Sequence, residues 1–486
     1  MSSVILHYVW VALQWGALAA YVIIIATLIV NVISENRNPL STIGWVMALV
    51  LIPVAGAVLY FIFGRSLRNI RMISRRGRRR LLASEPHAPL PKLSRELSAE
   101  NRQRVRMAYT VADSILYPDN TVELFNNGGE LFEPFFADLA AAREYINLQF
   151  YIISGDPVGQ RLRDILVERA RAGVKVRVIY DYIGSWGDGS HAVFKSLKES
   201  GVEVHAFFRI KFPDKISRIN WRNHRKVVVI DGRVGYIGGF NIARRYVDGG
   251  GTFALWRDLM ARVTGPAVGG LQNNFAIDWN FMGHSLLEDP ICPDNSAARP
   301  GAIPNVWAQL VASGPTSRWA STAFLFFKTI SGARQRVWIQ TPYFLPSDDL
   351  LKAVQTAALS GVDVRVMMPR RSDSSILTYA SNSFIEECLL SGVKIYLYRP
   401  GMLHSKLLIV DDDFSTLGST NFDYRSFDHN FEENIVMYSR EVNERLSRLY
   451  RDDLKESTQI KLSQWNRRPR GRRILESLCR LLSPIL

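Results

Sequence analysis

The sequence predicts an α/β protein with two repeated α/β/α sandwich halves, preceded by an N-terminal transmembrane helix hairpin. The chain opens with two long apolar stretches, and from about residue 119 short β-rich runs alternate with helical stretches, twice in the same order. The expected segments are two transmembrane helices (1–64), a basic juxtamembrane segment and linker (65–118), a first half (119–290), a second half (305–460) and a basic amphipathic C-terminal segment (461–486).

The first 64 residues are expected to form two membrane helices joined by a short loop. Residues 8–33 contain no charged side chain and are long enough to cross a hydrocarbon core of ~30 Å. A second apolar stretch runs from about Thr42 to Phe63, and the loop between the stretches holds an Asn38-Pro39 turn. The alternative is a cleaved signal peptide ending near Ala17-Leu-Ala19. We disfavour it because the apolar run has no basic segment before it and continues past that point.

Positive charge is concentrated in two segments that lie beside apolar sequence. The net charge is +15; residues 65–80 contain eight arginines and no acid, and residues 467–486 contain six arginines and one acid. The remainder is therefore close to neutral. A nuclease is expected to spread its positive charge around a substrate groove, whereas this distribution favours an anionic membrane surface. The first basic segment predicts that everything after residue 64 lies on the cytoplasmic side.

The two halves repeat the same order of strands and helices. The first half differs by a longer approach to its histidine motif, twenty residues from Val204 to His224 against nine from Ile395 to His404. This excess is either a lipid-facing loop or a packed surface excursion. The matched runs are 145–151 and 337–343, 173–179 and 361–367, and 201–204 and 392–395.

Each half carries one copy of a His-x-Lys-x4-Asp motif. Fourteen residues after each histidine comes a Gly-x2-Asn sequence, Gly238-Gly-Phe-Asn241 in the first copy and Gly418-Ser-Thr-Asn421 in the second. Two copies in the same register are not plausibly accidental. We therefore expect one duplicated site that holds a phosphodiester. The motif residues, taken as catalytic candidates, are His224, Lys226, Asp231, His404, Lys406 and Asp411.

The alternation of side chains along a strand assigns roles within each motif. The histidine and the lysine point to the same face, while the aspartate has the opposite parity, so we expect Asp231 and Asp411 to support the fold rather than touch substrate. The four apolar residues between lysine and aspartate predict a strand buried on both faces. Asn241 and Asn421 are expected to donate hydrogen bonds to phosphate oxygens.

Two further acids follow the motifs at comparable places. We expect Asp258 to hold the Nδ1 proton of His224, and Glu432 to hold that of His404, each within its own half. No cluster of carboxylates and histidines in the sequence suggests a metal, and we expect no metal or other cofactor. The lysines and asparagines are instead expected to stabilise charge on the phosphoryl oxygens. Two histidines permit a double displacement, one as nucleophile and one as acid and base.

These motifs resemble those of the phospholipase D superfamily, over roughly residues 119–450. Within it, the two apolar stretches and the Arg37-Asn-Pro-Leu-Ser-Thr-Ile-Gly-Trp-Val segment resemble the bacterial cardiolipin synthase family. The resemblance implies halves of phospholipase D type, with one site at their interface. It also implies a phosphatidyl-histidine intermediate, formed on His224 by the family pattern, and no metal.

The reaction implied by the resemblance joins two phosphatidylglycerols to give cardiolipin and glycerol. The implied partners are phosphatidylglycerol and anionic membrane lipid, without nucleic acid, and the implied location is the bacterial cytoplasmic (inner) membrane, multi-pass, with the catalytic body on the cytoplasmic side. The residues leave other functions open. These are a phospholipase D that uses water as the acceptor, a membrane-anchored nuclease, and a non-catalytic lipid-binding scaffold.

The last twenty residues predict an amphipathic helix. Apolar residues recur at helical spacing from Ile474 to Ile485, with arginines upstream. Such a helix either lies on anionic lipid or packs on the catalytic body. The three cysteines, Cys292, Cys388 and Cys479, have no metal-ligand or disulfide spacing and suit a reducing compartment.

Overall fold

The computed structural model of the chain describes residues 2–35, 39–64, 67, 70–83, 97–187, 189–210 and 219–486. The Asn38 position of the expected turn, residues 84–96 of the expected linker and residues 211–218 of the excursion before His224 lie outside the described residues. The chain divides into two units, Met1–Leu67 with Ile210–Asn220, and Arg68–Arg209 with Trp221–Leu486.

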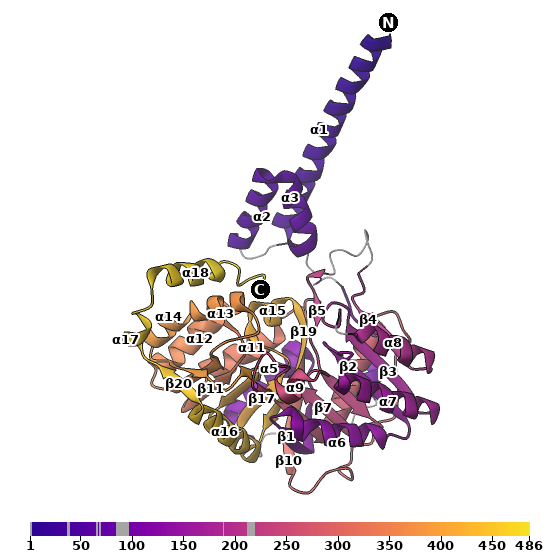
Figure 1. Cartoon of the computed structure of the whole chain (residues 1–486), viewed down its shortest axis with the longest axis vertical. Coiled ribbons are helices and arrows are strands. Elements are labelled where there is room, and N and C mark those ends of the chain that lie inside the picture. Colours follow the sequence, from indigo (N-terminus) through magenta and orange to yellow (C-terminus); the bar gives the residue numbers. More distant parts are fainter. Residues whose placement is uncertain are drawn as a thin grey trace. The chain divides into compact units, whose positions relative to one another are not determined.

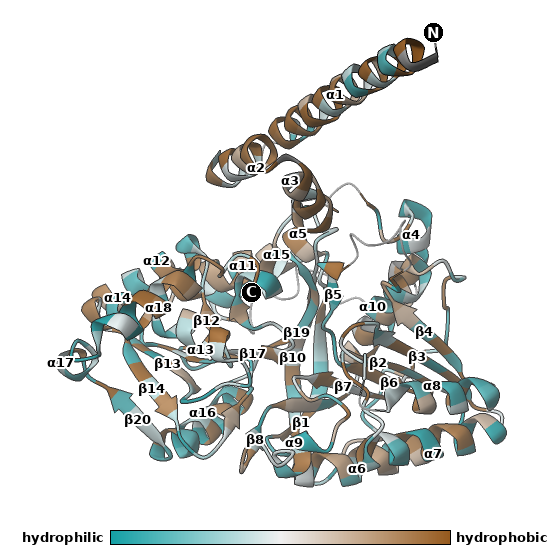
Figure 2. Ribbon diagram, turned by 45° about the horizontal axis from the view of Figure 1, so that its top comes forward, coloured by the Kyte–Doolittle hydropathy of each residue, from teal (hydrophilic) through white to brown (hydrophobic). Residues whose placement is uncertain are grey.

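The first unit contains one long apolar helix, α1 (Ser2–Ser34). Among the described residues it is the one helix long and apolar enough to cross a membrane, with 11% of its apolar window buried. In Figure 2 most of the α1 ribbon has the brown colour of hydrophobic residues. The end of α1 packs through Leu28 and Val32 on the helices that follow. This supports a membrane anchor at the N-terminus.

The second apolar stretch is not the single helix that the sequence predicts. It forms α2 (Pro39–Leu51), α3 (Pro53–Leu59) and a π-helical turn, η1 (Tyr60–Gly64). A Cβ atom added to Gly56 would lie 2.3 Å from the carbonyl oxygen of Ala48, eight residues earlier, so α3 folds back on α2. The break falls where a proline, which lacks a backbone N–H donor, begins α3.

The second unit is built on a 16-stranded sheet that runs through both halves (Figure 1). Its order is β4-β3-β2-β6-β7-β9-β1 in the first half and β10-β19-β17-β16-β11-β13-β14-β20 in the second, and the sixteenth strand, β5, pairs with β19 off this path. The halves join where β1 and β10 pair in antiparallel fashion. Seven strands of one half thus correspond in order to seven of the other, and the predicted repeat of two α/β/α halves is confirmed.

The elements of the first half and of the segment before it are α4 (Arg75–Ala83), α5 (Ala99–Ala112), β1 (Leu116–Phe125), α6 (Gly128–Ala140), β2 (Tyr145–Phe150), α7 (Pro157–Arg171), β3 (Lys175–Asp181), α8 (Ser190–Glu199), β4 (Glu203–Phe207), β5 (Arg222–Asn223), β6 (Val227–Ile230), β7 (Val234–Gly238), α9 (Arg245–Asp248), β8 (Trp256–Arg257), β9 (Met260–Thr264) and α10 (Ala267–Phe281). Helix α5 falls in the expected polar linker, yet it buries Val105 and Ala108 in the body.

The elements of the second half and of the C-terminal segment are β10 (Ile303–Ser313), α11 (Ser321–Ser331), β11 (Arg336–Gln340), β12 (Phe344–Leu345), α12 (Asp348–Leu359), β13 (Asp363–Pro369), α13 (Ser375–Asn382), α14 (Ile385–Leu390), β14 (Lys394–Tyr398), β15 (Met402–Leu403), β16 (Leu407–Val410), β17 (Phe414–Gly418), β18 (Phe422–Asp423), α15 (Tyr424–Asp428), β19 (Asn430–Tyr438), α16 (Arg440–Lys455), β20 (Ser457–Ile460), α17 (Leu462–Trp465) and α18 (Arg470–Arg480).

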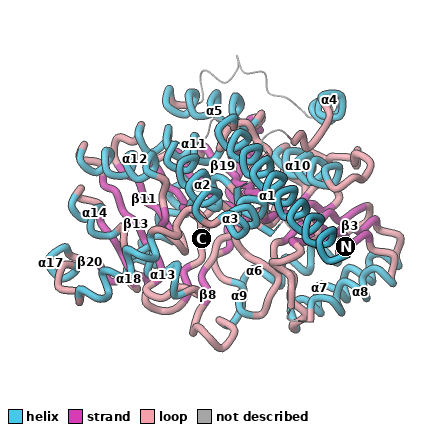
Figure 3. The backbone as a smooth tube through the Cα atoms, turned by 90° about the horizontal axis from the view of Figure 1, so that it is seen from above, coloured by secondary structure: helices cyan, strands magenta, loops and turns pink. Residues whose placement is uncertain are grey.

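Helices cover both faces of the sheet. Figure 3 shows strands between α10 on one side and α7 and α8 on the other. The motif strands are buried on both faces, as predicted: Val228 and Ile230 of β6 belong to one hydrophobic cluster, whereas Val227 and Val229 belong to the other. Strand β16 divides its four residues in the same way. These strands, buried on both faces, hold the motif histidines and lysines in rigid positions.

The motif aspartates lie in the turns after these strands. Asp231 accepts three backbone N–H hydrogen bonds, each 2.8 Å long, from Arg143, Glu144 and Tyr145 at the start of β2. Asp411 accepts equivalent bonds from residues 334–336 at the start of β11. Both adopt a left-handed backbone conformation, with φ of 52° and 50°. They tie the motif turn to the neighbouring strand.

We predict that Asp231→Ala lowers the free energy of unfolding of the body by about 2–3 kcal/mol, because hydrogen bonds to a charged acceptor are lost. Urea unfolding of the purified full chain, followed by tryptophan fluorescence, measures this. The control is Asp412→Ala, which removes a half-exposed ion pair to Arg336 at 3.4 Å, a type of contact worth about 0–1 kcal/mol. Equal effects of the two substitutions would contradict the assigned role of Asp231.

Candidate active site

Two short parallel ladders bring each histidine motif against the opposite half. Strand β5, which leads into the first motif, pairs with the start of β19, and β15, which leads into the second, pairs with β8. The ladders continue into the histidines themselves. The backbone N–H of His224 donates to the carbonyl of Phe431 at 2.9 Å, and that of His404 donates to the carbonyl of Arg257 at 2.7 Å.

The histidine–carboxylate pairs are therefore crossed between the halves. Nδ1 of His224 lies 3.0 and 3.1 Å from the two carboxylate oxygens of Glu432. Nδ1 of His404 lies 2.7 Å from Oδ2 of Asp258. The prediction that each acid serves the histidine of its own half is wrong, because strands pair across the interface and bring the distant acid closer. In each pair Nδ1 lies against a carboxylate, which favours the tautomer with its proton on Nδ1 and leaves Nε2 for chemistry.

The two lysines lie beside the histidines in the protein interior. Lys226 and Lys406 are buried, with exposed fractions of 1% and 3%. Nζ of Lys226 donates to the carbonyl oxygen of His224 at 2.5 Å, and Nζ of Lys406 lies 3.6 Å from Oδ2 of Asp258. Burial lowers the pKa of both ammonium groups, which the site carboxylates oppose. An anion bound here would further stabilise their charged forms.

The electrostatics of the site favour neutral imidazoles in the resting state. Burial is the main cause that lowers the pKa of His224, and the charge of Glu432 opposes it. Burial is the largest cause that lowers the pKa of His404 to about 4, and the positive charge of Lys406 is the next. Burial disfavours the ionised form of Asp258 and Glu432, but their lysine and histidine partners outweigh it and lower both pKa values. Both carboxylates are thus ionised beside neutral imidazoles at neutral pH.

The two asparagines complete a pair of matched sites. Oδ1 of Asn241 accepts from the backbone N–H of Ile152 at 3.1 Å, and its Nδ2 donates to the hydroxyl of Tyr246. Asn421 lies at the equivalent place, and its buried Oδ1 has no hydrogen-bond partner among the described residues. Asn241 and Asn421 both line the cavity described next.

Both histidines and both asparagines meet at one cavity of about 230 Å³. The structure thus brings eight of the ten candidates into one region, and it leaves Asp231 and Asp411 outside, in their turns. The sequence reasoning missed the arginines and tyrosines of the wall. One signal was available, since Arg245 and Arg425 each follow a motif asparagine by four residues. The missed lining residues include Tyr151, Tyr246, Tyr343, Arg222, Arg245 and Arg425.

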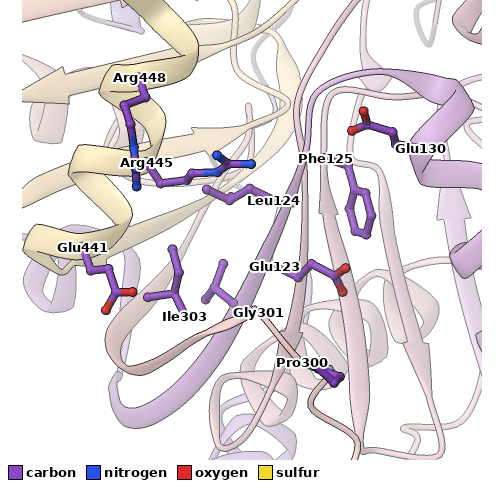
Figure 4. Close-up of a pocket in the computed structure, with 11 residues that line it drawn as sticks. Glu123, Leu124, Phe125, Glu130, Pro300, Gly301, Ile303, Glu441, Arg445 and Arg448 are labelled. Atoms are coloured by element: carbon purple, nitrogen blue, oxygen red, sulfur yellow. The ribbon is translucent and has the colours of Figure 1, made fainter.

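A larger cavity of about 500 Å³ lies elsewhere, between β1 and α16 (Figure 4). It mixes Glu123, Glu130 and Glu441 with Arg445 and Arg448, and it contains none of the motif residues. We therefore locate the chemistry at the smaller cavity. Within the described part of the chain, no group of three or more His, Cys, Asp and Glu side chains is arranged to hold a metal ion.

Comparison with known proteins relates this site to a family. The family described as "Cardiolipin synthase, PLD-like domain" matches residues 135–279 and 326–454, and "Phospholipase_D-nuclease N-terminal" matches residues 19–65. The chain is 38% identical to a cardiolipin synthase of Geobacillus kaustophilus, over 93% of this chain and 90% of that relative. It is 36% identical to a major cardiolipin synthase of Bacillus subtilis, over 96% and 98% of the two chains.

A solved structure shares the fold. It is a phosphatidylserine synthase from Haemophilus influenzae, with a TM-score of 0.60 and 14% sequence identity, and the similarity covers 79% of this chain and all of that one. At this identity the likeness concerns the architecture of the two halves alone.

We predict that His404 stays neutral from about pH 5 upwards in the substrate-free protein, because burial and Lys406 hold its pKa near 4. A pH titration of ¹⁵N-histidine-labelled protein in detergent, with the His404→Gln variant to assign the signal, measures this. Titration of the ring at or above the ordinary histidine pKa of about 6.5 would contradict the electrostatic account.

Proposed function

The chain belongs to the cardiolipin synthase family, phosphatidyltransferases of the phospholipase D superfamily, and we propose that its composite site transfers a phosphatidyl group from one phosphatidylglycerol to another, with release of glycerol. The observation that carries the mechanism is the pair of buried histidines at one cavity, each with Nδ1 against a carboxylate and Nε2 free of that bond. Phospholipids are its substrates; phosphatidylglycerol as both donor and acceptor is part of the proposal.

In the first step, Nε2 of His224 attacks the phosphorus of the donor lipid. The new N–P bond forms as the P–O bond to the headgroup glycerol breaks. His404 donates a proton to the departing glycerol oxygen. His404 is neutral at rest, but an anionic phosphodiester in the cavity raises its pKa, since a nearby negative charge favours the imidazolium. Substrate binding thus favours the protonated form of His404, which acts as the acid in the first step.

In the second step, His404 works in reverse as a base. It takes the proton from a hydroxyl of the second phosphatidylglycerol, whose oxygen attacks phosphorus and displaces the imidazole of His224. The N–P bond breaks, a P–O bond forms, and His224 returns to its neutral form. Because one residue performs both proton transfers, the same geometry serves both steps.

The remaining residues stabilise the charge on the phosphoryl oxygens. Lys226 and Lys406 supply positive charge in a buried site, and Asn241 and Asn421 supply neutral donors. Fixed donors in a dry site are worth more than the same groups in water, because they need no reorganisation as charge develops. None of the proposed steps involves a metal ion.

The C-terminal helix α18 supports contact with a lipid surface beside the site. Its polar face packs on the body, where Arg473 and Arg480 pair with Glu386 and Glu387 of α14 at 3.3 and 2.6 Å. Glu476 on this helix is 1% exposed. Its apolar side is solvent-exposed, with Leu478 56% and Leu481 75% accessible. We therefore propose that both alternatives from the sequence apply, with the helix packed on the body through one face and in contact with anionic lipid through the exposed apolar stripe. The residue that ends this segment, Leu486, lines the reaction cavity.

The proposed location is the bacterial cytoplasmic membrane. The apolar helix α1 is the anchor, and the folded pair α2–α3 is proposed as the second membrane segment of a multi-pass arrangement. Arginines 65–80 favour the cytoplasmic side for the catalytic body. The proposed limits of the two catalytic halves are residues 119–290 and 305–460.

The product profile tests the proposed function. Purified full-length protein in phosphatidylglycerol vesicles with a chelator present is expected to form cardiolipin and glycerol in equal amounts. Phosphatidic acid without cardiolipin would replace the synthase by a phospholipase D. Strict dependence on an added divalent metal would contradict the proposed stabilisation by lysine and asparagine.

Separate roles for the two histidines predict different labelling of two variants. With radiolabelled phosphatidylglycerol, His224→Ala is expected to form no covalent adduct, because no nucleophile remains. His404→Ala is expected to accumulate an adduct slowly and keep it, since it lacks an acid–base group worth about 10²–10⁴ in rate. Denaturing gels at alkaline pH preserve the acid-labile phosphohistidine. Label on His404 in the His224→Ala protein would reverse the two roles.

The apolar stripe of α18 predicts a change in membrane binding. We expect the double substitution Leu478→Gln and Leu481→Gln to weaken the binding of the catalytic body, freed of detergent, to anionic vesicles by about tenfold or more. The reason is that two exposed aliphatic side chains no longer enter the bilayer. Turnover of short-chain, detergent-dispersed substrate is expected to change little. The control is Leu359→Gln, an equally exposed residue (74%) at the end of α12. Equal weakening by the control would contradict a specific lipid contact by α18.

A further inference from the structure

Three arginines line the reaction cavity together with the motif histidines and asparagines, and they have no role in the proposed transfer mechanism. They are Arg222 on β5, Arg245 on α9 and Arg425 on α15. The one carboxylic acid among the described lining residues is Asp423. Burial raises the pKa of Asp423 to about 6, so this group is mostly ionised at neutral pH and offsets one of the three arginine charges. The cavity thus carries more positive charge than one phosphodiester requires.

Two of these arginines are symmetry mates. Arg245 and Arg425 each follow the motif asparagine of their half by four residues. Arg222 has no such mate, because the equivalent position in the second half is Met402. The strand pairing fixes this equivalence, since Arg222 pairs with Asn430 in one ladder and Met402 pairs with Trp256 in the other. The wall of the cavity is therefore asymmetric in charge although the catalytic residues are symmetric.

Arg222 and Arg425 lie close enough to perturb one another. Burial lowers the pKa of Arg425, and the charge of Arg222 lowers it further. Both charges also act on the buried hydroxyl of Tyr151, whose ring lies 4.9 Å from the ring of His224. Both residues line the same cavity, where their two guanidinium charges repel each other, and an anion bound between them would relieve this repulsion.

We propose that Arg222 and Arg425 form a second phosphodiester subsite, which binds the phosphate of the acceptor lipid while the first phosphate reacts at His224. This deepens the proposed function and rests on it. The product of the transfer carries two phosphodiesters joined by one three-carbon glycerol, so a site that builds it must hold two anions in one cavity. Guanidinium groups suit this task because their planar donors bind phosphate oxygens in a bidentate manner.

The subsite explains how one cavity favours a lipid acceptor over water. Water and the lipid hydroxyl need the same activation by His404, so the catalytic residues alone do not distinguish them. A second phosphodiester held by Arg222 and Arg425 positions the acceptor hydroxyl near the phosphoryl group and raises its effective concentration. The equivalent position in the second half, Met402, offers no such charge, which gives donor and acceptor different sides of a nearly symmetric site.

The test compares two acceptors on the same donor. Full-length wild type, Arg222→Gln, Arg425→Gln and Arg425→Lys are incubated in phosphatidylglycerol vesicles with radiolabelled glycerol. Glycerol returning to the phosphatidyl-enzyme reports transfer to an acceptor without phosphate, and cardiolipin reports transfer to an acceptor with one. The control is Arg233→Gln, an arginine outside the cavity, 42% exposed and paired with Asp294 at 3.2 Å.

We expect each glutamine variant to lower the ratio of cardiolipin formation to glycerol exchange by about tenfold to a hundredfold, the range for one lost hydrogen bond to a charged group. Phosphatidic acid should increase as water replaces the lipid acceptor. Arg425→Lys should recover part of the ratio, and Arg233→Gln should leave it unchanged.

Two outcomes would overturn the subsite. An unchanged ratio would mean that neither arginine contacts the acceptor. Equal loss of glycerol exchange and cardiolipin formation would place the arginines on the donor phosphate. Inorganic phosphate, added as a competitor, should inhibit cardiolipin formation more than glycerol exchange in wild type and not in Arg222→Gln; equal inhibition in both proteins would also count against the subsite. Failure of wild type to make cardiolipin would instead reject the proposed function, so the two failures are distinguishable.

Discussion

The crossed hydrogen bonds between each motif histidine and a carboxylate of the opposite half are the constraint on which this structure depends. Glu432 fixes the ring of His224, and Asp258 fixes the ring of His404. Neither half therefore contains a complete acid–base unit. The ladders β5–β19 and β15–β8 maintain this arrangement, because each pairs the strand that leads into one histidine with the strand that holds or precedes its acid. The histidine and the acid of the opposite half are therefore held in a fixed relative position. The continuous sheet joined at β1 and β10 serves as the rigid base for both ladders.

Much of the fold and of the site was accessible from the sequence. The repeat of strands, the doubly buried motif strands and the supporting place of Asp231 and Asp411 follow from periodicity and parity, which are local properties. The crossed pairing does not. It depends on which strand neighbours which, and Glu432 stands only 28 residues after His404 in a sequence that gives no sign that it serves His224. The arginines of the cavity could not be identified from the sequence, because a charged residue near a motif is ordinarily exposed to solvent.

The membrane part of the sequence was less predictable, for a physical reason. Hydropathy identifies apolar stretches but does not say where they bend, and the second stretch folds back at Ile52 as α2 and α3. Similarly, the periodicity of α18 identifies an apolar stripe without saying whether the body covers it. In the structure Glu476 is buried and Leu481 is exposed, the reverse of a soluble amphipathic helix. A substrate that resides in a bilayer explains why this polarity is useful beside a reaction cavity.

The central claim is that the two halves complete each other's histidine, and the ring nitrogens report this directly. ¹⁵N spectra of histidine-labelled Glu432→Gln and Asp258→Asn proteins would show which ring loses its partner. The account predicts that Glu432→Gln lowers the pKa and disturbs the Nδ1 proton of His224 alone, and that Asp258→Asn does the same to His404 alone. The reverse assignment, with Asp258 acting on His224 and Glu432 on His404, would contradict it.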